Sequence, residues 1–85
     1  MLFFVDARIV PGADIEPHLE EEVAAVKELV EQGFIERLYR REDETGAYLI
    51  VNAESTEVAQ QILDALPFPQ RGLMEMHVEP VEHLY

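Results

Sequence analysis

Apolar and polar residues alternate along the first ten positions, in LFFVDARIV (2–10). One side of an extended chain would carry only apolar side chains: Phe3, Val5, Ala7 and Ile9. The other side would be mixed: Leu2, Phe4, Asp6, Arg8 and Val10. This pattern predicts a β-strand with one dry face and one mixed face.

The period changes to that of a helix after the break at PGAD (11–14). The apolar positions that follow are Leu19, Val23, Val26, Leu29 and Val30, at helical spacing. Asp14 or Glu16 could cap this helix, and Gly33 suits the position after its end. We expect the acidic run 20–22 to lie on its solvated face.

Alternation returns in FIERLYRR (34–41) and AYLIVN (47–52), and the polar turn between them predicts a hairpin. In the first strand, Phe34 and Leu38 should share the dry face. The mixed face should carry the remaining large side chains: Ile35, Arg37, Tyr39 and Arg41 from the first strand, and Tyr48, Ile50 and Asn52 from the second.

A second helix should begin at the cap Ser55 and end at Pro67, because a residue before proline avoids the helical region. Pro69 is expected to keep the connection extended. The last strand, LMEMHVE (73–79), puts Met74, Met76 and Val78 on the dry face. Its mixed face carries Leu73, Glu75, His77 and Glu79, and Pro80 ends it.

The resulting order, βαββαβ, repeats one unit twice and predicts a single α+β domain over residues 1–85 with a ferredoxin-like, four-stranded antiparallel sheet. Right-handed crossovers place both helices on one face. The mixed face is then left uncovered, and its apolar part needs a partner. Two copies packed face to face would form a dimeric α+β barrel, so we expect a homodimer or higher homo-oligomer.

The net charge of the chain argues against two classes of binding partner. The net charge is -12, from 18 acidic residues against 6 Lys plus Arg, which argues against nucleic acid and against an anionic membrane surface. The chain has no Cys, its apolar start is too short for a signal peptide, and no apolar run approaches the roughly 20 residues of a membrane span. We expect a cytoplasmic protein.

Ionisable residues gather on the mixed face. If the first and last strands are neighbours, Asp6 and Arg8 lie beside Glu75 and His77. Asp6 and His77 are the candidate catalytic residues, because a carboxylate and an imidazole in a partly dry cavity can transfer protons. Six residues are candidates for binding a small anionic molecule, since arginine clamps carboxylates: Arg8, Arg37, Tyr39, Tyr48, Asn52 and Glu75.

Each candidate also has a structural interpretation. Asp6 could form an ion pair with Arg8 or Arg37, His77 could be an interface residue, and Tyr39 and Tyr48 could simply pack across strands. Asp6, Glu75 and His77 could also supply three metal ligands, but no tight ligand motif supports this. We therefore expect neither a metal nor a cofactor.

Three passages resemble the muconolactone isomerase family: MLFFV at the start, EQGFIERLYR (31–40) and LDALPFPQRGLMEMHVEPVEHL (63–84). The Leu-Pro and Phe-Pro pairs at 66–69 are the most specific part. Arg40 and Tyr48 align with that family as well. In this chain Phe68 directly follows Pro67, whereas the family usually has one more residue between the two prolines, and the first helix is more acidic.

The resemblance implies face-to-face dimers, often in larger rings, and cofactor-free isomerisation of a small lactone acid by proton transfer. Two alternatives remain open: a non-catalytic oligomeric binding or accessory protein, and a haem or quinol monooxygenase of the same barrel type. An enclosed pocket of roughly 300 Å³ or more, lined by Asp6 and His77, would favour catalysis.

Overall fold

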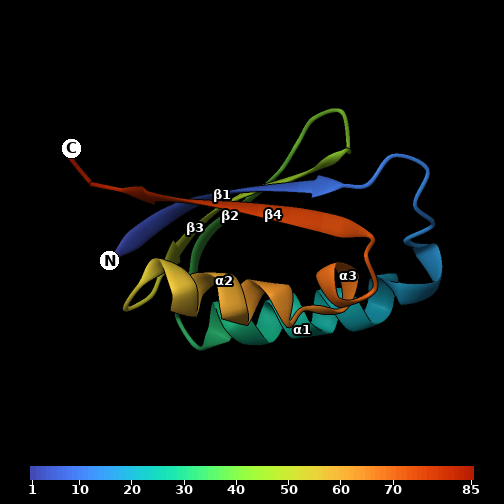
Figure 1. Cartoon of the computed structure of the whole chain (residues 1–85), viewed down its shortest axis with the longest axis horizontal. Helices are drawn as coiled ribbons and strands as arrows, with labels where there is room; N and C mark the ends of the chain where they lie inside the picture. Colours follow the sequence, from blue (N-terminus) through green and yellow to red (C-terminus); the bar gives the residue numbers. More distant parts are fainter.

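Four antiparallel strands form one sheet, and the helices lie together on one of its faces (Figure 1). The computed structural model describes all residues, 1–85. The strands are β1 (Leu2–Ile9), β2 (Ile35–Arg40), β3 (Gly46–Asn52) and β4 (Met74–Val81). The helices are the 3-10 helix η1 (Glu16–His18), α1 (Leu19–Glu31), α2 (Thr56–Asp64) and α3 (Pro67–Gln70). The strand order β2-β3-β1-β4 makes β1 and β4 neighbours and confirms the predicted α+β topology.

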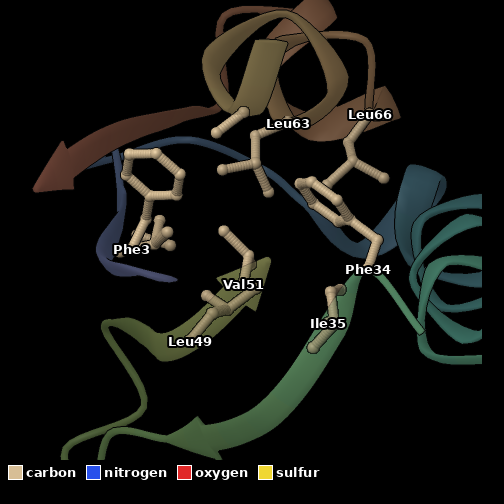
Figure 2. Close-up of a cluster of buried hydrophobic side chains, with 10 residues drawn as sticks. Phe3, Phe34, Ile35, Leu49, Val51, Leu63 and Leu66 are labelled. Atoms are coloured by element: carbon tan, nitrogen blue, oxygen red, sulfur yellow. The ribbon is translucent and has the colours of Figure 1, made fainter. Parts of the chain in front are cut away.

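The core lies between the sheet and the helices (Figure 2). Phe3 and Val5 of β1 and Val51 of β3 are fully buried, and they pack against Leu63 of α2. These strand residues are the ones that alternation assigned to the dry face. The helices therefore cover the face that the sequence predicted.

One strand departs from simple alternation. The pairing of β2 with β3 shifts between Ile35 and Arg37, so β2 carries a bulge there. An extra residue breaks the period of two, and both Phe34 and Ile35 are buried. The assignment of Ile35 to the mixed face was therefore wrong. Leu38 pairs with the buried Leu49, yet it is 47% exposed, since the β2–β3 hairpin bends away from the helices (Figure 1).

The helix ends follow the sequence only in part. Ser55 caps α2 as predicted, with its Oγ accepting a hydrogen bond from the Val58 N–H. Gly33 follows α1 with a φ of +83°, where glycine is favoured. Neither Asp14 nor Glu16 caps a helix, because the chain enters α1 through η1 without a side-chain cap. No helix has the length and apolar content needed to cross a membrane.

The Leu-Pro-Phe-Pro segment forms a helical turn rather than an extended connection. Leu66 is extended, as expected before proline, but Pro67 begins α3 and Pro69 lies inside it. Proline is compatible with a first helical position, since its N–H would be unpaired there anyway. The Phe68 N–H donates to the Oε1 atom of Glu22 at 2.8 Å. Glu22 is only 6% exposed, so its prediction as a solvated residue was wrong.

Candidate functional site

All eight predicted site residues lie on the face of the sheet opposite the helices, which we call the open face. Cross-strand pairing shows this, since paired residues project to the same side. The central row across the sheet contains four of them, in the order Tyr39, Tyr48, Asp6 and His77. The row on one side contains Arg37, Ile50, Phe4 and Glu79, and the row on the other contains Gly46, Arg8 and Glu75. Leu2, Asn52 and Val81 form a fourth row at the end of the face.

Asp6 and Arg8 form an ion pair along β1. Arg8 Nη2 lies 3.1 Å from Asp6 Oδ2, and Arg8 Nε also donates to both carboxylate oxygens. The hydrogen bonds to Asp6, and then the charge of Asp6, raise the pKa of Arg8. In a single chain Asp6 therefore has the structural ion pair that the sequence left open as an alternative.

His77 is paired along β4 rather than across to β1. Its Nε2 lies 2.9 Å from Glu79 Oε1, and its side chain is 74% exposed. A carboxylate on one ring nitrogen orients the imidazole and leaves Nδ1 free to exchange a proton. Sequence reasoning did not select Glu79 as a site residue. Its place two residues from His77, on the same side of a strand, was the available signal.

An aromatic stack runs diagonally over β1 and β3. The rings of Phe4 and Tyr48 lie 5.5 Å apart at 25°, and the guanidinium of Arg41 lies 5.4 Å from the centre of the Tyr48 ring. Arg41 also pairs with Asp43 at 3.4 Å, while its Nη1 is buried without a hydrogen-bond partner. The sequence placed Arg41 on this face but did not propose it as a site residue.

Arg37 is the open-face guanidinium without an ion pair or hydrogen bond in the chain. It lines a hollow of about 350 Å³. Three of its lining residues are apolar, Leu2, Ile50 and Val81, and the others beside Arg37 are Glu36, Glu82 and His83. A guanidinium without an ion pair, beside apolar side chains, can hold an organic anion, although Glu36 and Glu82 lie in the same hollow.

A second hollow, of about 540 Å³, lies at the other end of the face and is lined by Arg8, Glu44, Thr45 and Glu75. Each hollow has one arginine and two glutamates, but Arg8 is already paired with Asp6, so the hollow of the unpaired Arg37 suits an anion better. Neither hollow is lined by Asp6 or His77. One chain alone therefore does not form the enclosed Asp6–His77 pocket that would favour catalysis.

The carboxylates and imidazoles of the face do not form a metal centre. No three or more His, Asp or Glu side chains gather closely enough to hold a metal ion. The alternative of Asp6, Glu75 and His77 as ligands is therefore not supported by the geometry.

Comparison with protein families identifies the chain. The family model of muconolactone delta-isomerase matches residues 1–84. The chain belongs to the muconolactone delta-isomerase family. Comparison with curated protein sequences gave no match.

Solved structures agree with this family in fold. The chain resembles 5-chloro-2-hydroxyhydroquinone dehydrochlorinase from Burkholderia phenoliruptrix AC1100, whose structure is a complex with 2,5-dihydroxybenzoquinone. The TM-score is 0.75 and the sequence identity is 24%, and the match covers 98% of this chain and 95% of that one. It also resembles a muconolactone isomerase, with a TM-score of 0.73 and 21% identity over 98% of this chain and 91% of that one. At these identities the likeness extends to the fold alone.

Proposed function

We propose that the protein is a cofactor-independent isomerase that moves a proton on a small lactone or carboxylate anion, at an open face covered by a second copy of the chain. The observation that carries the proposal is the pairing of His77 with Glu79 on the same uncovered face as the free Arg37, in a chain of the muconolactone delta-isomerase family. This face supplies a proton-transfer group and an anion clamp.

The distribution of charge supports an anionic substrate. The chain has a net charge of -12 and only 6 Lys plus Arg. Three of these, Arg8, Arg37 and Arg41, lie on the open face. Arg8 and Arg41 are paired with Asp6 and Asp43, so Arg37 is the guanidinium of this face that is left to attract an anion.

We assign the residues of the open face to separate roles in the reaction. His77 or Asp6 removes a proton from a carbon next to the substrate carbonyl and returns it elsewhere, so the double bond moves and no electrons are gained or lost. Arg37 or Arg8 holds the carboxylate. Tyr39, Tyr48, Asn52 and Glu75 shape the site and orient the substrate. We favour His77 and Arg37, since Asp6 and Arg8 already neutralise each other.

The two similar solved structures are enzymes whose names point to related substrates. One is a muconolactone isomerase, and the other is a dehydrochlorinase of a chlorinated hydroxyhydroquinone with a dihydroxybenzoquinone bound. Both names describe small, oxygen-rich molecules derived from a ring. Muconolactone and a chlorinated hydroxyhydroquinone are therefore the first two substrates to test.

The test is turnover of muconolactone in D₂O, followed by NMR. We expect isomerisation with deuterium taken up from solvent, and a loss of at least about 100-fold in kcat in His77→Ala, with the oligomer intact by light scattering. His18→Ala, on the helix side, is the matched control and should keep full activity. If the wild-type chain turns over neither compound nor related lactone acids, it is a non-catalytic binding or accessory protein. If His77→Ala dissociates the oligomer, the histidine is structural.

A further inference from the structure

The hollow at Arg37 has two chemically different ends, because it runs across the sheet order β2-β3-β1-β4. Arg37 and Glu36 line it from β2, and Glu82 and His83 line it from the tail that follows β4. The lining between these ends is apolar: Ile50 of β3, Leu2 of β1 and Val81 of β4. A small molecule that spans the hollow therefore meets a guanidinium at one end and a carboxylate with an imidazole at the other.

The charged groups of this hollow have no partners of their own. The ion pairs of the chain all join other residues, so Arg37, Glu36 and Glu82 are each unpaired. A ligand carboxylate gains charge-assisted hydrogen bonds from a guanidinium. A second carboxylate at the far end would instead face Glu82, and opposing like charges is costly. The hollow therefore treats the two ends of a ligand differently.

We propose that Glu82 makes this hollow selective by charge, so that a carboxylate binds well at Arg37 only when the other end of the molecule carries no negative charge. The ligand class is a monocarboxylate with a short apolar body and a neutral or cationic polar end. His83 donates a hydrogen bond to a neutral oxygen at that end, such as a lactone carbonyl. The inference rests on the proposed function for the use of this hollow by a substrate, and it adds the residue that decides which carboxylates enter.

The two glutamates of the hollow differ in what they do to a ligand. Glu36 directly precedes Arg37 on β2, so its charge weakens the binding of every carboxylate by a similar factor, whatever the other end of the ligand carries. Glu82 lies beyond the apolar stretch, so its charge acts on the second end alone. This difference provides a matched control within the same hollow.

Three benzoate probes that share one ring test the charge selectivity without any turnover. Terephthalate carries a carboxylate at its second end, monomethyl terephthalate carries a neutral ester, and para-(aminomethyl)benzoate carries an ammonium group. At about 20 mM salt, where screening is weak, the ester and the ammonium compound should each bind at least about fivefold more tightly than terephthalate. NMR titration of the isotope-labelled chain gives the three dissociation constants, and the amide shifts of Arg37 and Glu82 locate the probe in this hollow.

Three variants assign the selectivity to residues. Glu82→Gln should remove it and bring the three dissociation constants to within about twofold of one another. Glu36→Gln is the matched control, and it should tighten the binding of all three probes while their order stays the same. Arg37→Ala should weaken all three at least about tenfold, because it removes the guanidinium that their shared carboxylate contacts.

Each of four results would overturn the inference: no binding of any probe, terephthalate binding as tightly as its monoester, selectivity that survives in Glu82→Gln, or binding that is insensitive to Arg37→Ala. Failure of the inference can be told apart from failure of the proposed function. Isomerase activity without charge selectivity sinks the inference alone. Charge selectivity in a chain that turns over no lactone acid sinks the proposed function and leaves Glu82 as the selective residue of a binding protein.

Discussion

Glu22 is the charged side chain that the fold buries most deeply. Its carboxylate accepts the Phe68 N–H, and the neighbouring Glu21 binds Arg71 at 2.9 Å, so α1 holds α3 through two adjacent residues. Burial raises the pKa of Glu22 above its ordinary value of 4.5, against the smaller opposite effect of the hydrogen bond. The hydrogen bond to Arg71 lowers the pKa of Glu21. Two consecutive glutamates thus have opposite environments.

We expect Glu22→Ala to lower the free energy of unfolding by about 1–3 kcal/mol, since it leaves the buried Phe68 N–H without an acceptor. Glu22→Gln keeps an acceptor oxygen and should cost less. Glu20→Ala, exposed on the same helix, is the control and should change the free energy by less than about 0.5 kcal/mol. Equal losses in Glu22→Ala and Glu20→Ala, measured by urea unfolding, would contradict a role for this hydrogen bond.

The raised pKa of Glu22 also predicts how stability changes with pH. The folded chain binds this proton more tightly than the unfolded chain, so the stabilising contribution is complete below pH 4.5 and is lost as pH rises through the folded pKa. Relative to Glu22→Gln, the wild type should therefore lose free energy of unfolding as the pH rises above 4.5. A difference between the two proteins that stays constant with pH would show that burial does not shift this group.

At the level of elements, the alternation of apolar and polar residues predicted the strands that have one buried and one exposed face. Alternation gave β1, β3 and β4 and the covered face, because one residue in two must enter the core. The bulge in β2 and the helical turn α3 were missed. An inserted residue carries no marker in the sequence, and a proline that ends one helix can equally begin the next. The burial of Glu22 was missed for a related reason, since its partner is 46 residues away.

Phe68 makes α3 part of the core rather than a surface connection. It is 4% exposed at the centre of the Leu-Pro-Phe-Pro turn. We expect Phe68→Ala to reduce the free energy of unfolding by about 3–5 kcal/mol, through the lost burial and the cavity left behind. Gln70→Ala, exposed at the end of the same turn, loses only the hydrogen bond from its side chain to the Asp64 carbonyl and should cost less than about 1.5 kcal/mol. A loss below about 1 kcal/mol in Phe68→Ala would show that this turn is packed loosely.

At the level of the whole molecule, the sequence located the candidate site but not its contacts. All eight selected residues lie on the open face, because the side on which a strand residue projects follows from its number. Residue number does not tell which of these side chains form ion pairs with one another. Residues two apart on a strand share a face, and in this chain those pairs form: Asp6 with Arg8, and His77 with Glu79. Glu79 and Arg41 were missed because their roles depend on neighbours rather than on position.

The location of the contact between copies decides whether the open face can be a site at all. Ile50 lies at the middle of this face, between Phe4 and Arg37, and is half-buried in the single chain. Ile50→Asp leaves the core intact but would place an unpaired carboxylate between two sheets, so it should raise the dissociation constant at least about 100-fold while the circular dichroism stays native. Val30→Asp, on the exposed side of α1, is the control and should leave association unchanged. Sedimentation equilibrium of both variants distinguishes the two faces. If Val30→Asp dissociates the oligomer and Ile50→Asp does not, the copies meet through their helices, and the open face is not the contact between copies.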